Sequence, residues 1–207
     1  MLEINHLRIT YGPVVAVDDA SLSVGADEFV VITGSNGSGK SSLARSVVGL
    51  VSISHGHVRV DGQEARSASD WRQRRRDVAY VPQRTSPGSF PLLVRELLES
   101  GGNIERSMRT AERLGINELL DRPVTTLSGG QLQRSYLARA FGSLQQARMI
   151  IADEPTSALD FSGQEDVASL LADVPIARLI ISHDAAVVAR ADRVLEMAGG
   201  SLRERAA

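Results

Sequence analysis

The chain of 207 residues has no cysteine, little net charge and no apolar run long enough to span a membrane. Without cysteine it can form neither a disulfide framework nor a zinc or iron–sulfur site with thiolate ligands. A transmembrane helix needs about 18 or more apolar residues in a row, and a signal peptide needs a basic start before an apolar segment. Neither pattern is present. The formal net charge of −2 gives no electrostatic reason to expect broad nucleic-acid binding. We therefore expect one cytoplasmic α/β domain that reaches a membrane only through a partner.

What the sequence does contain is a glycine-rich loop that ends in lysine, Gly34–Ser41. An apolar run, Phe29–Thr33, precedes it, and a helical pattern follows. A flexible glycine turn before a lysine is the alternative, but this strand–loop–helix order favours phosphate binding. Lys40 would reach the β- and γ-phosphates, and the Ser41 hydroxyl would bind Mg²⁺. The predicted nucleotide contacts are Gly34, Ser35, Asn36, Gly37, Ser38, Gly39, Lys40, Ser41 and Ser42.

A second motif is the apolar strand Met149–Ala152, which ends in two carboxylates, Asp153 and Glu154. By itself this pattern also fits a helix start with acidic residues in its first turn. Next to a phosphate loop, it predicts that Asp153 binds Mg²⁺ directly or through water. Glu154 is then placed to polarise the water that attacks the γ-phosphate.

A third motif, Leu127–Gln131, stands directly before a helical pattern. A serine N-cap with a glycine turn is the simple explanation. A helix start with free N–H groups is also an anion site, so the chain has two such starts far apart in sequence. We expect one to hold the nucleotide and the other, from a second subunit, to close over the γ-phosphate. The predicted contacts there are Ser128, Gly129, Gly130 and Gln131.

Strand and helix patterns alternate along most of the chain, which predicts a mostly parallel sheet. Strands are expected at 2–10, 20–24, 28–33, 57–60, 78–81, 149–152, 178–181 and 193–197. Helical patterns occur at 93–100, 104–114, 130–144, 163–172 and 185–190. The first two lie between residues 84 and 128, after a Pro/Gly/Ser loop at 85–91. We interpret this segment as a short helical subdomain inserted into an α/β core, in a single domain of residues 1–207.

These motifs, in this order, resemble those of the ATP-binding subunits of ABC transporters, and the similarity covers essentially the whole chain. Leu127–Gln131 is similar to the signature sequence of that superfamily, and Asp153-Glu154 to the Walker B aspartate and the catalytic glutamate. The remaining matches are with the Q-loop glutamine (Gln83), the D-loop (Ser157–Asp160), the switch histidine (His183) and the aromatic residue that stacks on adenine (Tyr11). Each of these would mean little alone.

The resemblance implies a P-loop ATPase fold with an N-terminal antiparallel β subdomain, and it implies ATP and Mg²⁺ as cofactors. Two copies would enclose two ATP molecules, with Lys40 and Ser41 of one subunit facing Ser128 and Gly130 of the other. Gln83 would contact Mg²⁺ and the attacking water, and His183 the γ-phosphate. Expected partners are integral membrane permease subunits and a solute-binding protein, with this chain peripheral on the cytoplasmic face. The segments Tyr80–Thr85 and Phe90-Pro91 are similar to those of zinc/manganese-type importers.

Two rival functions remain at this point. One is a soluble ABC-type ATPase that acts on DNA or ribosomes, but neither a long coiled-coil or cysteine-rich zinc insertion nor a second cassette is present. The other is a P-loop kinase or GTPase, which leaves Leu127–Gln131 unexplained. The arginines at positions 72, 74, 75 and 76, next to Trp71, are expected on a solvated loop or helix face, with anionic lipid or a membrane partner as the alternative.

Overall fold

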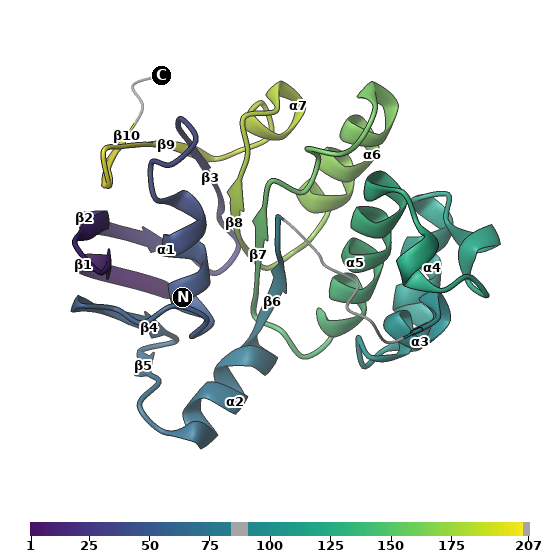
Figure 1. Ribbon diagram of the computed structural model, residues 1–207, viewed down its shortest axis with the longest axis horizontal. Helices are drawn as coiled ribbons and strands as arrows, with labels where there is room; N and C mark the ends of the chain where they lie inside the picture. The colour runs from purple at the N-terminus through teal and green to yellow at the C-terminus, as the bar shows by residue number, and fades with distance from the viewer. Residues whose placement is uncertain (84–90, 205–207) are drawn as a thin grey trace.

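The computed structural model describes residues 1–83 and 91–204, whose strands form two sheets (Figure 1). The first sheet is antiparallel, and its strand order is β2-β1-β4-β5. Its strands are β1 (Leu2–Tyr11), β2 (Val14–Val24), β4 (His55–Val60) and β5 (Gln63–Glu64). This sheet is the expected N-terminal antiparallel part.

The second sheet has the order β10-β9-β3-β8-β7-β6. Its neighbouring strands run parallel from β9 to β6, and only β10 is antiparallel to its neighbour. The strands are β3 (Phe29–Thr33), β6 (Val78–Val81), β7 (Met149–Asp153), β8 (Ala177–Ile181), β9 (Arg193–Ala198) and β10 (Ser201–Glu204). The middle of such a sheet is buried on both faces, which explains why β3, β7 and β8 are almost continuously apolar.

Helices cover both faces of this sheet. They are α1 (Lys40–Val47), α2 (Ala68–Asp77), α3 (Val94–Glu99), α4 (Ile104–Arg113), α5 (Gly129–Ser143), α6 (Phe161–Ala172) and α7 (Ala185–Val188), with 3₁₀ turns η1 (Asn117–Leu119) and η2 (Val124–Thr126). The segment between β6 and β7 contributes α3, α4 and α5, which lie together at one end of the molecule (Figure 1). No helix among the described residues is long and apolar enough to cross a lipid bilayer.

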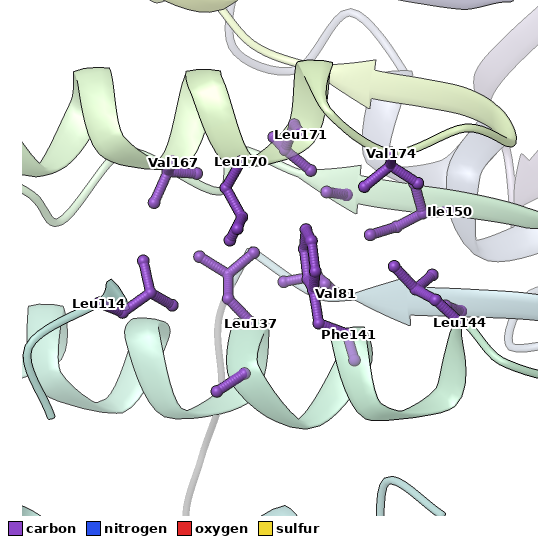
Figure 2. Close-up of a cluster of buried hydrophobic side chains, with 14 of the residues drawn as sticks. Val81, Leu114, Leu137, Phe141, Leu144, Ile150, Val167, Leu170, Leu171 and Val174 are labelled. Carbon is purple, nitrogen blue, oxygen red and sulfur yellow. The ribbon is translucent and has the colours of Figure 1, made fainter. Parts of the chain in front are cut away.

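Successive residues of a strand face opposite sides of its sheet, and β3 feeds two cores in this way. Val30 and Ile32 pack with α1 and the antiparallel sheet. Phe29 and Val31 belong to the other cluster, which α5 and α6 complete. Figure 2 shows this second cluster, where Leu137 and Phe141 of α5 lie opposite residues of α6. Truncating a fully buried leucine such as Leu137 to alanine typically costs about 2–5 kcal/mol of stability.

The fold class predicted from the sequence is confirmed, and most elements lie within a few residues of their expected bounds. The elements that were missed are the first half of β2, the short strand β5, helix α2, strand β10 and the two 3₁₀ turns. The expected loop at 85–91 and the importer-like Phe90 fall on residues 84–90, outside the described residues, although Pro91 is described.

The arginine cluster corrects the expectation of a wholly solvated face. Arg72, Arg75 and Arg76 are exposed on α2, as expected, but Arg74 is buried. Its guanidinium donates hydrogen bonds to the carbonyl oxygens of Val47 (3.1 Å) and Gln63 (2.6 Å). It also lies 5.8 Å from the centre of the Trp71 ring. Arg74 therefore fastens α2 to α1 and β5, and burial lowers the pKa of its guanidinium.

Candidate nucleotide site

The candidate site lies at the carboxyl ends of three neighbouring strands, β3, β8 and β7. The phosphate loop follows β3, His183 follows β8, and Asp153 ends β7. Parallel strands present their carboxyl ends at the same edge, which is where open α/β sheets bind ligands. The phosphate loop, Asp153 and His183, which lie far apart in the sequence, therefore meet at one edge of the sheet.

The phosphate loop folds around the side chain of Lys40. Lys40 is buried, and its Nζ donates hydrogen bonds to the carbonyl oxygens of Gly34 (2.7 Å) and Ser35 (2.8 Å). Gly39 has a φ of 106°, and an added Cβ would lie 2.1 Å from the Ala16 carbonyl oxygen, so no other residue fits there. As the residue before α1, Gly39 has no capping side chain, which leaves the first N–H groups of α1 to a ligand.

Asp153 is fully buried on the α1 side of the sheet. Burial raises the pKa of its carboxyl above the usual 3.8, while the Ser41 hydroxyl, Arg45 and Lys40 favour the charged form. Neither carboxylate oxygen has a hydrogen bond of ordinary geometry with any described residue. A buried acid without such partners is costly unless something else satisfies it, so the site fits a cation.

Mg²⁺ is the cation whose requirements this donor set matches. It prefers oxygen ligands and is usually held by one or two carboxylates together with substrate phosphates and waters. The Asp153 carboxylate and the Ser41 hydroxyl supply such oxygens. Among the described residues, no group of three or more His, Asp or Glu side chains is placed to hold a metal ion.

Glu154 and His183 form a pair beside this acid. The Glu154 side chain is buried, and His183 Nδ1 lies 3.1 Å from its Oε1 and 3.0 Å from its Oε2. The His183 side chain is 76% exposed, so the pair joins a buried carboxylate to an imidazole ring that is open to solvent. Glu154 has a φ of 50°, an uncommon value for a residue other than glycine, and its N–H donates to the Ile181 carbonyl oxygen (2.8 Å). Strained backbone of this kind clusters at functional sites.

The structure also brings Tyr11 to the phosphate loop. Tyr11 is 49% exposed, and its hydroxyl lies 3.2 Å from Ser42 Oγ at the start of α1. A half-exposed aromatic ring at this place is available for stacking. Gln83 is half-buried and comes two residues after β6, at the same edge of the sheet as Asp153.

The fourth predicted group, Ser128–Gln131, does not join these residues. Ser128 caps α5 through a reciprocal pair of hydrogen bonds: the Ser128 N–H donates to Gln131 Oε1 (3.0 Å), and the Gln131 N–H donates to Ser128 Oγ (3.3 Å). Figure 1 shows α5 and α1 apart, on either side of β7 and β8. No hydrogen bond within residues 1–83 and 91–204 connects this group with the phosphate loop.

The start of α5 instead packs against the segment that follows Glu154. A Cβ added to Gly130 would lie 2.8 Å from the Ala158 carbonyl oxygen, which requires a glycine at this position. Arg134 of α5 donates from Nη2 to Asp160 Oδ1 (3.3 Å), and the same oxygen accepts the N–H of Gly163 at the start of α6. The predicted signature and D-loop segments are therefore in contact within one subunit.

Sequence reasoning missed two neighbours of Asp153. Tyr80 of β6 lies on the same sheet face, and burial together with the Asp153 charge raises the pKa of its phenol. Its hydroxyl is buried without a hydrogen-bond partner among the described residues. Arg45 of α1 lowers the pKa of both groups. The available signal was the two-residue period of β6 and β7, which becomes informative only when their register is known.

Fold and site together define a P-loop nucleoside triphosphatase, because an uncapped phosphate loop, a buried acid and a second acid share one sheet edge. Comparison with known proteins specifies the family. Residues 17–157 match the family described as ABC transporter. The chain belongs to this family, as an ATP-binding subunit that hydrolyses ATP.

Two relatives and one solved structure illustrate the likeness. The zinc import ATP-binding protein ZnuC of Cereibacter sphaeroides is 35% identical, over 94% of this chain and 78% of the relative. ZnuC of Paracoccus denitrificans is 36% identical, over 90% and 77%. The dimeric ATP-binding cassette MJ0796 in a post-hydrolysis state, bound to ADP and Pi, superposes with a TM-score of 0.87 at 25% identity, covering 99% of this chain and 98% of that one.

Proposed function

We propose that this chain is the energy-coupling subunit of a transporter, which hydrolyses ATP while a separate membrane subunit carries the substrate. The observation that carries the proposal is the meeting of Lys40 and Asp153 with the Glu154–His183 pair at one sheet edge. Lys40 and the first N–H groups of α1 would hold the β- and γ-phosphates. Ser41, Asp153 and Gln83 would hold Mg²⁺, which when bound neutralises charge on the phosphates. The Tyr11 ring would stack on adenine.

Glu154 is the proposed general base. Its carboxylate would accept a hydrogen bond from the attacking water and orient that water toward the γ-phosphate. The backbone of Glu154 has a left-handed conformation and is held by its hydrogen bond to Ile181, which would help to orient the carboxylate. His183 contacts this carboxylate from the solvent side. From the same position His183 would contact the γ-phosphate. Phosphoryl transfer needs little more than this positioning and charge stabilisation.

The site of one subunit is proposed to be incomplete. The γ-phosphate side is open at His183, whereas the capped start of α5 is exposed and far from the phosphate loop of its own subunit. In a two-fold dimer, Ser128–Gln131 of each copy would close the site of the other copy, giving two equivalent sites. The dimeric state of the relative bound to ADP and Pi supports a dimer of this chain. ATP would favour the closed dimer and hydrolysis the open one.

A groove is proposed as the docking place for the membrane subunit. A cavity of about 390 Å³ separates the end of α1 and β6 from α3 and α5. Leu50, which is 61% exposed, lines it together with Arg75, Arg76 and Arg139. An apolar floor with a basic rim fits an amphipathic segment that carries acidic residues. Tyr80 also lines this cavity, so the docking place would be continuous with the surroundings of Asp153.

The proposed cargo is a divalent metal ion, taken up with the help of a solute-binding protein. The names of the two zinc-import relatives support this choice. The cassette would sit on the cytoplasmic face as a peripheral subunit, as its proposed role beside a separate membrane subunit requires.

Affinity purification followed by reconstitution tests the proposal. A tagged chain is purified with detergent from the membranes of its own cells, and the proteins that accompany it are identified by mass spectrometry. We expect a protein with several membrane spans, and we expect Leu50→Glu to lose it while ATP binding stays intact. The purified pair in liposomes should then take up zinc or manganese, read with a metal-sensitive dye in the lumen, only when ATP and Mg²⁺ are trapped inside, on the side of the cassette. Glu154→Gln should abolish uptake.

The two parts of the proposal fail separately. Recovery of ribosomes or DNA, with no membrane-spanning protein, would overturn the transport function. Recovery of a membrane partner whose ATP-driven activity moves neither metal would support the energy-coupling role and refute the proposal that the cargo is a metal ion.

A further inference from the structure

Phe161 is the most exposed large hydrophobic residue of the described chain, with 80% of its surface accessible. It is the first residue of α6 and directly follows Asp160, which caps that helix. Its ring is therefore presented by a fixed helix start, not by an open loop. A phenylalanine this exposed gains little from burial in the subunit that carries it, and rigid aromatic side chains are typical anchors of protein interfaces.

Phe161 stands at the border of a cavity of about 600 Å³. Helix α7 and the residue that caps its end contribute three small apolar residues to the lining, Ala185, Ala186 and Ala189. The ion pair between Arg190 and Glu165 (2.7 Å) forms part of the rim. The cavity thus has an apolar floor, a charged rim and an aromatic side chain beside it.

Both features border the proposed catalytic groups. The same cavity is lined by His183, whose side chain is exposed, and by Thr156 and Ser157, which follow Glu154. A two-fold contact is self-complementary, so each copy must offer both the inserted group and the surface that receives it. Each copy of this chain offers both: the Phe161 ring as the group that inserts, and the neighbouring cavity as the surface that receives it.

We propose that, in the ATP-bound dimer, Phe161 of each subunit inserts into the alanine-lined cavity between α6 and α7 of the other subunit. The occupant of this surface is a second copy of this chain, and the proposal rests on the dimeric site proposed above. Phe161 would contribute to the closed dimer without contacting the nucleotide. Because it lies one residue from Asp160, which also binds Arg134 of α5, its burial would stabilise the segment that supports the start of α5.

The first test measures the strength of the dimer. The Glu154→Gln variant, expected to retain ATP, serves as the parent and is examined by sedimentation over a range of protein concentrations with ATP and Mg²⁺. Adding Phe161→Ala should raise the dimer dissociation constant at least about tenfold, as loss of an interface anchor does. Phe161→Leu should have a smaller effect. The control is Ile104→Ala, which removes a 42% exposed apolar residue from α4 and should change nothing.

The second test locates the ring, and the absence of native cysteine makes it specific. A tagged Phe161→Cys protein and an untagged Ala189→Cys protein, both carrying Glu154→Gln, are mixed and treated with a short thiol cross-linker. We expect tagged–untagged dimers with ATP and none without it. An Ile104→Cys protein in place of Ala189→Cys should give none.

The outcomes separate this inference from the proposed function. A parent variant that stays monomeric with ATP at every concentration would refute the dimeric site itself. A parent that dimerises as strongly with Phe161→Ala as without it, or that gives no cross-link to position 189, would refute the role of Phe161 alone. Nucleotide binding by the monomer and its melting temperature should be the same with and without Phe161→Ala, which excludes a folding defect as the cause.

Discussion

The starts of α1 and α5 are both predicted anion sites, yet the structure builds them in opposite ways. At α1 the preceding residue is Gly39, with no capping side chain, and the neighbouring Asp153 is buried without ordinary hydrogen bonds. At α5 the Ser128 and Gln131 side chains satisfy the backbone reciprocally, and Ser128 is exposed. The first site has groups that need a ligand, and the second is stable without one.

This contrast predicts an order of events. We expect the start of α1 to bind nucleotide and metal in a single subunit, because the proposed donors and acids are already assembled at one sheet edge. The start of α5 can remain exposed to solvent at little cost, because the Ser128 and Gln131 side chains already form hydrogen bonds with its backbone N–H groups. It becomes useful only when another subunit presents a phosphate. We therefore infer that nucleotide binding and site closure are separable properties of this chain.

Changing the base should give the largest effect and show that chemistry belongs to the first site. Glu154→Gln is expected to lower the rate of ATP turnover about 10²–10⁴-fold, the usual contribution of a positioned general base. Nucleotide binding should persist and dimers should accumulate. Turnover is measured under saturating ATP, with Glu118→Gln, an exposed carboxylate on η1, as the control. Rapid turnover by Glu154→Gln would refute the assignment.

Lys40→Ala tests whether the first site holds phosphate on its own. Charge-assisted hydrogen bonds contribute about 1.5–3 kcal/mol each, so losing Lys40 should weaken ATP binding roughly a hundredfold or more. Binding of a fluorescent ATP analogue to dilute, monomeric protein measures it. Arg72→Ala removes an exposed positive charge from α2 and should bind normally. Wild-type affinity in Lys40→Ala would mean that the loop is not the phosphate site.

Ser128→Arg tests the second site by blocking it. Nucleotide binding by the monomer should stay within about twofold, because α5 does not touch the phosphate loop of its own subunit, while ATP turnover should fall at least about tenfold. Ser128→Ala removes the cap, at a typical cost of 0.5–2 kcal/mol, without adding bulk, and should reduce turnover less. An ATP-dependent dimer of Ser128→Arg on size exclusion would argue against the two-subunit site.

Asp153→Asn should give the smallest change, in the stability of the metal-free protein. Burial raises the pKa of the Asp153 carboxyl above 3.8. The buried charge therefore lowers the free energy of unfolding at neutral pH. This loss disappears below about pH 4, where the carboxyl is protonated in both the folded and the unfolded state. Asn should therefore raise the melting temperature at about pH 8, and the gain should shrink toward pH 4. Thermal melts with a chelator present measure it.

The control for this prediction is Asp166→Asn, an exposed acid on α6. A gain from Asp153→Asn that does not vary with pH, or that matches the control, would show that Asp153 carries no burial cost. The same variant should also need far more Mg²⁺ to retain nucleotide.

Local patterns revealed much of this molecule from sequence alone. The continuous run of β3 and the glycine spacing before Lys40 depend on neighbours in the chain, so both were predicted. Helix α2 was missed because ASDWRQRRRD has no apolar period, and its one buried arginine is recognisable only from the carbonyl groups of Val47 and Gln63 that it meets. The places of Tyr80 and Arg45 beside Asp153 depend on strand register and helix packing, which no local pattern contains.

The most direct test of the account is the ATP turnover per subunit of the wild-type chain, without partners, as a function of protein concentration. If each site is completed by a second copy, the turnover per subunit should increase steeply with protein concentration in the dilute range and become constant once dimers form. Nucleotide binding per subunit should stay constant across the series. A turnover per subunit that is constant down to concentrations at which sedimentation detects only monomers would contradict the account.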